Sequence, residues 1–96
     1  MCYISCVRFE WDPRKAQINQ RKHEVSFDEA AECFADSLAM VLTDRAHAER
    51  LILIGQSTSL RLIFTVYAEK DGDIIRIISA RKATRTERRT YEEGDF

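Results

Sequence analysis

Residues 74–90 form a concentrated block of positive charge in a chain whose net charge is close to zero. The whole sequence carries 15 Lys and Arg against 16 Asp and Glu, a net charge of −1. Within residues 74–90, six arginines and lysines stand against one glutamate, a net charge of +5. Such a block favours binding of an anion. A solvated helix face would have the same composition, so the charge pattern is compatible with both.

The chain has two histidines, the residue type that exchanges protons near neutral pH. His23 follows Lys22 at the end of a predicted helix, whereas His47 lies in a polar connection near Arg45 and Arg50. His23 is therefore a candidate general acid or base. The alternative is a surface histidine without a catalytic role, because the dipole at a helix C-terminus favours an imidazolium there. Both interpretations stay open. For His47 we expect only a surface position.

Four basic residues lie on or just after predicted strands. Arg61 and Arg76 interrupt hydrophobic strands and either point to solvent or line a sheet face, where a guanidinium binds phosphate with two hydrogen bonds. We favour solvent for Arg61 and function for Arg76. Arg81 and Lys82 precede a predicted helix N-terminus, a position that favours anions. Function is favoured for Arg81, and the two interpretations are balanced for Lys82.

Other kinds of site lack support in the sequence. Cys2, Cys6 and Cys33 are an odd number without a disulfide spacing, which is typical of a reducing compartment. Cys2 and Cys6 have no second ligand pair that would complete a zinc site. The sequence has no Gly-rich phosphate loop and no paired carboxylates at metal spacing. We predict neither a metal nor a cofactor.

The first third of the chain predicts a strand and two helices. Val7, Phe9 and Trp11 alternate with polar residues, as in a half-buried strand. Asp12-Pro13 ends that strand and begins a helix that should run to about His23. A capping box of Ser26 and Glu29 then opens a second helix, whose apolar stripe consists of Phe27, Ala30, Ala31 and Phe34.

The remaining chain predicts strands followed by a helix. The strands are expected at Leu38–Thr43, Leu51–Gln56, Leu60–Ala68 and Ile74–Ala80, with a hairpin turn at Lys70–Asp73. A second capping box, Thr84 with Glu87, opens a helix that carries Arg88, Arg89 and Tyr91. Helices grouped before a run of strands predict an α+β fold with an antiparallel sheet meander.

Length and composition predict a small globular protein. Residues 1–96 are too few for two independent cores, so we expect one domain. No stretch approaches the ~20 apolar residues of a membrane helix. The N-terminus also lacks the pattern of a signal peptide. We therefore expect a cytoplasmic location without membrane association.

Several strings carry a more specific signal than periodicity does. They are Phe9-Glu10-Trp11-Asp12-Pro13, Asn19, Lys22-His23, Val25-Ser26-Phe27, Glu29-Ala30, the run Ile75–Thr84, Glu87-Arg88 and Tyr91-Glu92. Together they resemble the BrnT family of bacterial type II toxins over about residues 7–93. Residues 1–6 form an N-terminal extension beyond the usual start of that family.

The resemblance implies a RelE-like fold and an endoribonuclease that cleaves mRNA and arrests growth. It also implies an antitoxin of ribbon–helix–helix type, encoded nearby, that binds the toxin and represses the shared operon. Operator DNA would then be bound only through the antitoxin.

The implied reaction is attack of a 2′-hydroxyl on the adjacent phosphate, which needs a base, an acid and cations around phosphorus. We predict catalytic roles for Lys22, His23, Arg76 and Arg81. We predict RNA contacts from Arg61, Lys82, Arg85 and Arg88, and a reaction that needs no metal.

One position departs from the family pattern. The family usually has Gly after Lys-His, where this chain has Glu24. Glu24 must take a strained φ or end the helix differently, which would affect the placement of Lys22 and His23. A second hypothesis is therefore a non-catalytic binding module whose basic surface engages an acidic protein partner or nucleic acid.

Overall fold

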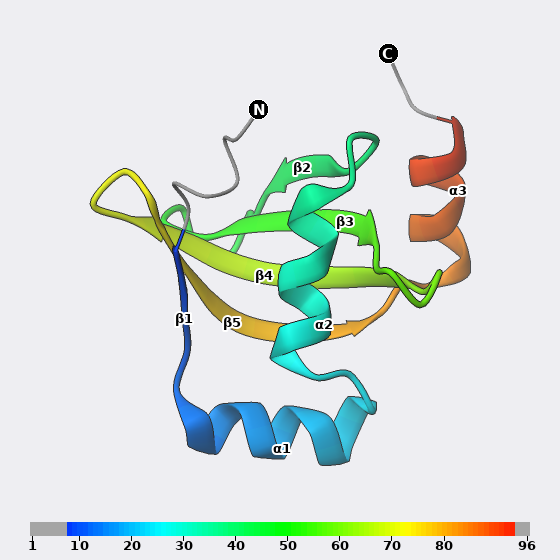
Figure 1. Ribbon diagram of the computed structural model, residues 1–96. Helices are drawn as coiled ribbons and strands as arrows, with labels where there is room; N and C mark the ends of the chain where they lie inside the picture. The colour runs from blue at the N-terminus through cyan, green and yellow to red at the C-terminus, as the bar shows by residue number, and fades with distance from the viewer. Residues whose placement is uncertain (1–7, 94–96) are drawn as a thin grey trace.

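The computed structural model describes residues 8–93, which form a five-stranded sheet with helices on it (Figure 1). In chain order the elements are β1 (Arg8–Glu10), α1 (Pro13–His23), α2 (Phe27–Glu32), the 3-10 helix η2 (Cys33–Ala35), β2 (Met40–Thr43), β3 (Leu51–Gln56), β4 (Leu62–Lys70), β5 (Ile74–Lys82) and α3 (Arg85–Glu93). The predicted α+β class is confirmed. The predicted extension at residues 1–6, with Cys2 and Cys6, and Val7 of the first predicted strand lie outside the described residues.

The strands are arranged in the order β1-β5-β4-β3-β2. Strands β2 to β5 pair antiparallel with their neighbours in sequence, so the predicted meander is confirmed. β1 pairs in parallel with β5, Arg8 opposite Ile74 and Glu10 opposite Arg76. The sheet is therefore mixed, which the sequence did not predict, because alternation identifies a strand and not its partner.

α1 begins and ends where its sequence signals indicate. Asp12 accepts a hydrogen bond from the backbone N–H of Arg14 at 2.9 Å, and Pro13 is the first helical residue. After His23, Glu24 adopts the left-handed conformation at φ 60°, and its N–H donates to the carbonyl of Gln20. Of the two possible endings, the chain adopts the strained one, at a cost of roughly 1–2 kcal/mol for a non-glycine residue.

The capping box of α2 is only half confirmed. The Ser26 hydroxyl accepts from the backbone N–H of Glu29 at 3.0 Å, as predicted. The Glu29 carboxylate instead accepts hydrogen bonds from the Ser57 hydroxyl and the Arg61 guanidinium. A charged partner from another element therefore takes the place of the local backbone donor, because an ionic hydrogen bond is the stronger one.

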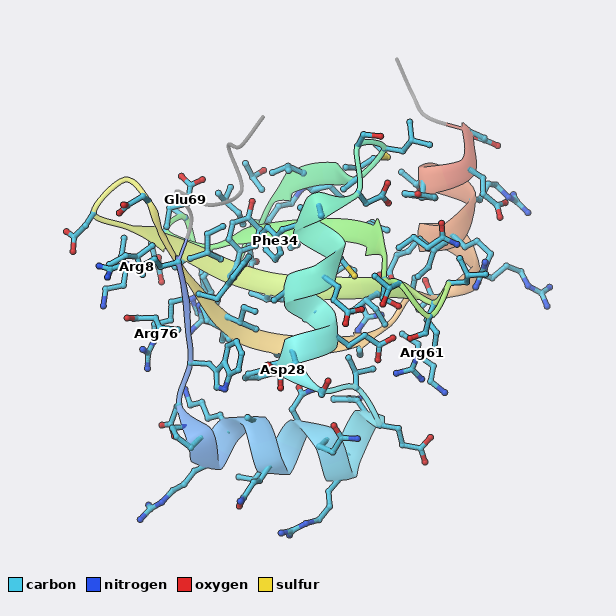
Figure 2. The ribbon with its side chains drawn as sticks, viewed as in Figure 1. Arg8, Asp28, Phe34, Arg61, Glu69 and Arg76 are labelled. Carbon is cyan, nitrogen blue, oxygen red and sulfur yellow. The ribbon has the colours of Figure 1, made fainter. Side chains whose placement is uncertain are left out.

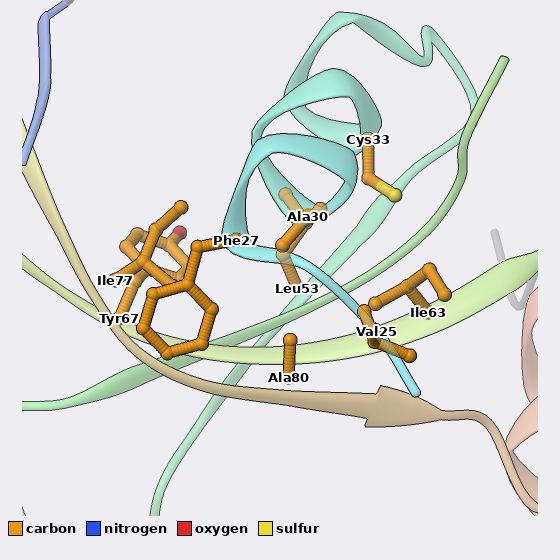
Figure 3. Close-up of a cluster of buried hydrophobic side chains, with 9 residues drawn as sticks. All are labelled: Val25, Phe27, Ala30, Cys33, Leu53, Ile63, Tyr67, Ile77 and Ala80. Atoms are coloured by element: carbon orange, nitrogen blue, oxygen red, sulfur yellow. The ribbon is translucent and has the colours of Figure 1, made fainter. Parts of the chain in front are cut away.

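The hydrophobic core lies between α2 and the sheet (Figures 1 and 3). Its buried members are Val25, Phe27, Ala30, Cys33, Leu53, Ile63, Tyr67, Ile77 and Ala80. Gly55 of β3 lets η2 approach closely, since a Cβ at this position would lie 2.9 Å from the carbonyl oxygen of Cys33. The apolar stripe predicted for the second helix thus faces the sheet.

Two predicted strand boundaries were wrong. Leu60 was expected at the start of a strand, but it has φ 67° and is 76% exposed, and β4 begins at Leu62. Leu38 precedes β2, because its N–H donates to the Asp36 carboxylate rather than to a strand. The predicted turn at Lys70–Asp73 is confirmed: Asp71 and Gly72 both have positive φ, as a tight hairpin of this twist requires. No helix of the described residues is long and apolar enough to cross a membrane.

Candidate active site

A groove lies between α1 and β5, where α1 runs along the β5 side of the sheet (Figure 1). It encloses about 250 Å³ and is lined by Lys15, Ile18, Asn19, Lys22, His23, Ile78 and Ser79. The five residues from α1 are spaced as one helical face. Two of the predicted catalytic residues, Lys22 and His23, therefore meet here, 55 or more residues away in sequence from the strand that forms the other wall.

Asn19 fixes α1 beside β5. It is 7% exposed, and its amide group donates to the carbonyl of Ala80 at 2.7 Å and accepts from the N–H of Ala80 at 3.1 Å. The same amide donates to the carbonyl of Val25 at 2.9 Å, just after the helix. One side chain thus pairs with the edge of β5 as a neighbouring strand would. No local pattern indicates this role, because Asn19 stands among other polar residues.

The groove has the composition of an anion site. Lys15 and Lys22 are exposed, His23 is half-buried, and Ser79 contributes a hydroxyl. No carboxylate lines the groove among the described residues. Within residues 8–93, Lys15, Lys22 and His23 form no ion pair with a carboxylate. Their cationic and proton-transfer capacity is therefore available to a ligand.

A bulge in β5 places Arg76 and Arg81 on one face of the sheet. Residues five positions apart in a regular strand point to opposite faces. Here the register between β4 and β5 shifts, so that Ser79 lies opposite Val66 while Ile77 lies opposite Tyr67. Ile78 is the extra residue of this bulge. Arg76, Ser79 and Arg81 consequently share a face, and Ser79 connects that face to the groove.

Both arginines on this face are held by carboxylates. Arg76 donates to Glu10 at 2.9 Å, and Arg81 donates to both carboxylate oxygens of Glu87 at 2.9 Å. The Arg81 guanidinium also lies 3.9 Å from the centre of the Phe64 ring. A phosphate that binds either guanidinium must share it with, or displace it from, a carboxylate.

These ion pairs lower the pKa values of both carboxyl groups. Hydrogen bonds from Lys70 and then Arg76 hold the pKa of Glu10 below its ordinary value. Burial raises the pKa of Glu87, but its hydrogen bonds with Arg81 and Thr84 outweigh burial and lower the pKa overall. The Thr84–Glu87 capping box is reciprocal, with bonds of 2.8 and 3.2 Å, as predicted.

Arg61 is partly exposed and forms hydrogen bonds with other residues of the chain. It lies before β4 and on the other side of α2 from Arg76 in Figure 2. Its Nε donates to Glu29 at 2.9 Å, and its Nη2 donates to the carbonyl of Glu24 at 2.9 Å. Arg61 thus lies against the turn between α1 and α2. There it holds the carbonyl of Glu24, the strained residue that follows Lys22 and His23.

The three remaining predicted RNA contacts are not gathered at the groove. Lys82 lies 3.9 Å from Glu24, at the end of β5, and Arg88 lies 3.9 Å from Glu92. Arg85 and Arg88 are exposed on α3, which stands at one end of the sheet (Figure 1). None of these residues lines the groove.

No site role was predicted for Lys15, Ile18, Asn19, Ile78 and Ser79, although the last three lie in the strings that resemble the BrnT family. The spacing of Lys15 and Lys22, two helical turns apart, was a readable signal that both share a face. The strand half of the groove had no such signal, because the bulge depends on pairing with β4. Within the described residues, no group of three or more His, Cys, Asp or Glu side chains is placed to hold a metal ion.

The chain and its fold are similar to known proteins. The sequence model of the ribonuclease toxin BrnT of type II toxin–antitoxin systems matches residues 11–87. A solved structure, the ribonuclease toxin BrnT of Brucella abortus, is 26% identical and superposes with a TM-score of 0.68, covering 82% of this chain and 99% of that one. The comparison with curated proteins finds no significant match. Because the family match spans most of the chain, this protein belongs to the BrnT family of ribonuclease toxins of type II toxin–antitoxin systems.

Proposed function

We propose that this toxin cleaves mRNA in the cytoplasm, and that the groove between α1 and β5 is its catalytic centre. The observation that carries the proposal is the meeting of Lys22 and His23 in a groove without a carboxylate among the described residues. A cationic groove attracts a phosphodiester, and an imidazole in it can transfer protons.

Each of these residues has a separate role in the proposed reaction. The 2′-oxygen attacks the adjacent phosphorus, the bond to the 5′-oxygen of the next nucleotide breaks, and a 2′,3′-cyclic phosphate remains. His23 accepts the proton of the attacking hydroxyl, and the departing 5′-oxygen takes a proton from water. Lys22 stabilises the extra negative charge on the phosphate oxygens, with Arg76 and Arg81 on the face that Ser79 connects to the groove.

The donor set favours a reaction without a metal. Mg²⁺ is held by carboxylate oxygens, whereas lysine and histidine line this groove. The side chains themselves would supply the positive charge. Cleavage should therefore persist in EDTA, and loss of cleavage that Mg²⁺ restores would contradict this part of the proposal.

The partner we propose is a ribbon–helix–helix antitoxin encoded next to the toxin, with operator DNA bound only through the antitoxin. The support is the BrnT family membership. Co-expression with the product of the adjacent reading frame should yield a complex that copurifies and binds operator DNA. The toxin alone should not bind that DNA.

A basic binding module is the less favoured alternative. Of the cations in residues 74–90, Arg76, Arg81, Lys82 and Arg88 each lie within 4 Å of a carboxylate, at 2.9, 2.9, 3.9 and 3.9 Å. Four of the six cations of the +5 block thus lie near carboxylates of the same molecule. This pairing leaves less of the positive charge for an acidic partner than the sequence suggests.

The decisive experiment is to induce the protein alone in bacteria and to map the 5′ ends of transcripts. We expect growth arrest and new 5′ ends, both abolished in a Lys22→Ala/His23→Ala double variant that still folds. Growth arrest without new ends, or arrest by the double variant as well, would favour the binding module.

A further inference from the structure

Four of the seven residues that line the groove have no part in the proposed chemistry and no structural role so far. Lys15, Ile18, Ile78 and Ser79 line the same groove as Lys22 and His23. Lys15 precedes Lys22 by two helical turns, about 10 Å along the axis. The groove is therefore longer than the binding of a single phosphate requires.

Lys15 supplies a second cation at the far end of the groove. It is exposed and forms no ion pair with a carboxylate of residues 8–93. An ammonium group in this position can bind the phosphate next to the one held at Lys22. Both phosphates would belong to one strand running along α1.

Between the two lysines the groove has apolar walls. Ile18 lies on the face of α1 that lines the groove, yet it is 58% exposed. Ile78 lies on the opposite wall, in the bulge of β5. Bulges re-aim side chains beside functional sites. Two isoleucines from opposite walls, with the Ser79 hydroxyl next to them, suit a flat group with apolar faces and a polar edge.

We propose that this part of the groove binds one nucleotide of single-stranded RNA next to the cleaved bond, with its phosphate on Lys15 and its base between Ile18 and Ile78. The inference rests on the proposed function, because it takes the same groove as the cleavage site. It assigns RNA affinity to Lys15 and base preference to Ile18, separately from the chemistry at His23.

Lys15 is tested by binding and cleavage of a short single-stranded RNA. Binding is measured on an RNA whose attacking 2′-hydroxyl is replaced by hydrogen, which cannot be cleaved. Lys15→Ala should raise Kd and KM about tenfold with kcat unchanged, and should lower the salt dependence of binding by about 0.7 in log–log slope. The matched control is Arg21→Ala, which removes the same charge from an exposed position of α1 outside the groove.

Ile18 is tested with RNAs that differ at one base beside the cleavage position. Ile18→Ala should reduce the discrimination among these RNAs by about three- to tenfold, since a lost apolar contact costs that order of selectivity. Leu38→Ala is the control, because Leu38 is 61% exposed and lies outside the groove.

The outcomes separate the two proposals. If the wild type neither binds nor cleaves RNA, the proposed function and this inference are both wrong. If the wild type cleaves while Lys15→Ala matches Arg21→Ala and Ile18→Ala matches Leu38→Ala, only the nucleotide site is wrong. A loss of kcat rather than of affinity in Lys15→Ala would also contradict it, because Lys15 would then belong to the chemistry.

Discussion

His23 and the predicted arginines are held in different ways. Arg61, Arg76 and Arg81 each donate a hydrogen bond of 2.9 Å to a carboxylate. His23 is half-buried in the groove and has no carboxylate partner within residues 8–93. A guanidinium on a carboxylate serves first to fix structure, whereas an imidazole without such a partner is free to exchange protons with a ligand.

Replacing His23 by Gln should therefore separate positioning from proton transfer. Gln retains hydrogen bonding but takes up no proton at neutral pH, so kcat should fall by about 100-fold or more. The rates of both proteins are measured from about pH 5 to 8, and the two pH profiles should differ in shape, because only the wild type has a proton-transfer group at position 23.

The control for this substitution is His47→Gln, which changes the other histidine, exposed and outside the groove. Its rate and pH profile should match the wild type. Superimposable profiles for the wild type and His23→Gln would remove His23 from the mechanism.

At the scale of elements, α1 and α3 are attached to the sheet by polar contacts. The buried residue of α1 is Asn19, and α3 has no buried residue. α3 is held by the Arg81–Glu87 pair and by the Tyr91 hydroxyl, which donates to Asp36 at 2.7 Å. Both helices thus depend on a few directed hydrogen bonds more than on apolar area.

Asn19→Ala should destabilise the whole protein by about 2–4 kcal/mol, because it leaves the N–H and carbonyl of Ala80 without partners in a buried site. Urea unfolding measures the change. Gln17→Ala, an exposed polar residue of the same helix, should stay within about 0.5 kcal/mol of the wild type. Equal stability of the two variants would show that Asn19 does not fix α1.

Tyr91→Phe should loosen α3 without unfolding the rest. Burial, with the hydrogen bond to Asp36, raises the pKa of Tyr91 to about 12, so the hydroxyl stays a donor at neutral pH. Its loss should cost about 1 kcal/mol, which is roughly fivefold faster hydrogen exchange in residues 85–93. Asp36 keeps its bonds from Leu38 and Gln56, so amides of β3 should be unaffected, as in the control Glu93→Gln.

Across the whole molecule, carboxylates join different elements. Glu10 links β1 to β4 and β5, Glu29 links α2 to the segment before β4, and Glu87 links α3 to β5. The pKa of Glu29 lies below its ordinary value of 4.5, chiefly through its hydrogen bonds with Arg61. A carboxyl with a lowered folded-state pKa stabilises the protein above its unfolded pKa and loses that contribution as the pH falls through the folded value.

The free energy of unfolding should therefore fall as the pH drops below about 4.5. Glu29→Gln should be less stable than the wild type by about 2 kcal/mol at neutral pH, and the difference should shrink in acid as the wild-type carboxylate becomes protonated. Asp28→Asn, an exposed neighbour, is the control and should change stability little. A constant gap between Glu29→Gln and the wild type down to about pH 2 would contradict the ion-pair account.

The sequence by itself determined the elements and most of their ends. Asp12, Ser26 and Thr84 cap helices through contacts two or three residues away, and runs rich in Ile, Leu and Val mark strands β3 to β5. These interactions are local, so each is readable without the fold. The adjacent Lys22 and His23 were identified for the same reason.

Only the tertiary structure decided how these elements form a site. The bulge at Ile78 reverses the side-chain direction along β5, so that Arg76 and Arg81 share a face that alternation alone would deny them. Asn19 joins α1 to Ala80 across 61 residues, and thereby creates the groove. Register and long-range pairing depend on which partner a strand finds, and no local pattern in one segment encodes that choice.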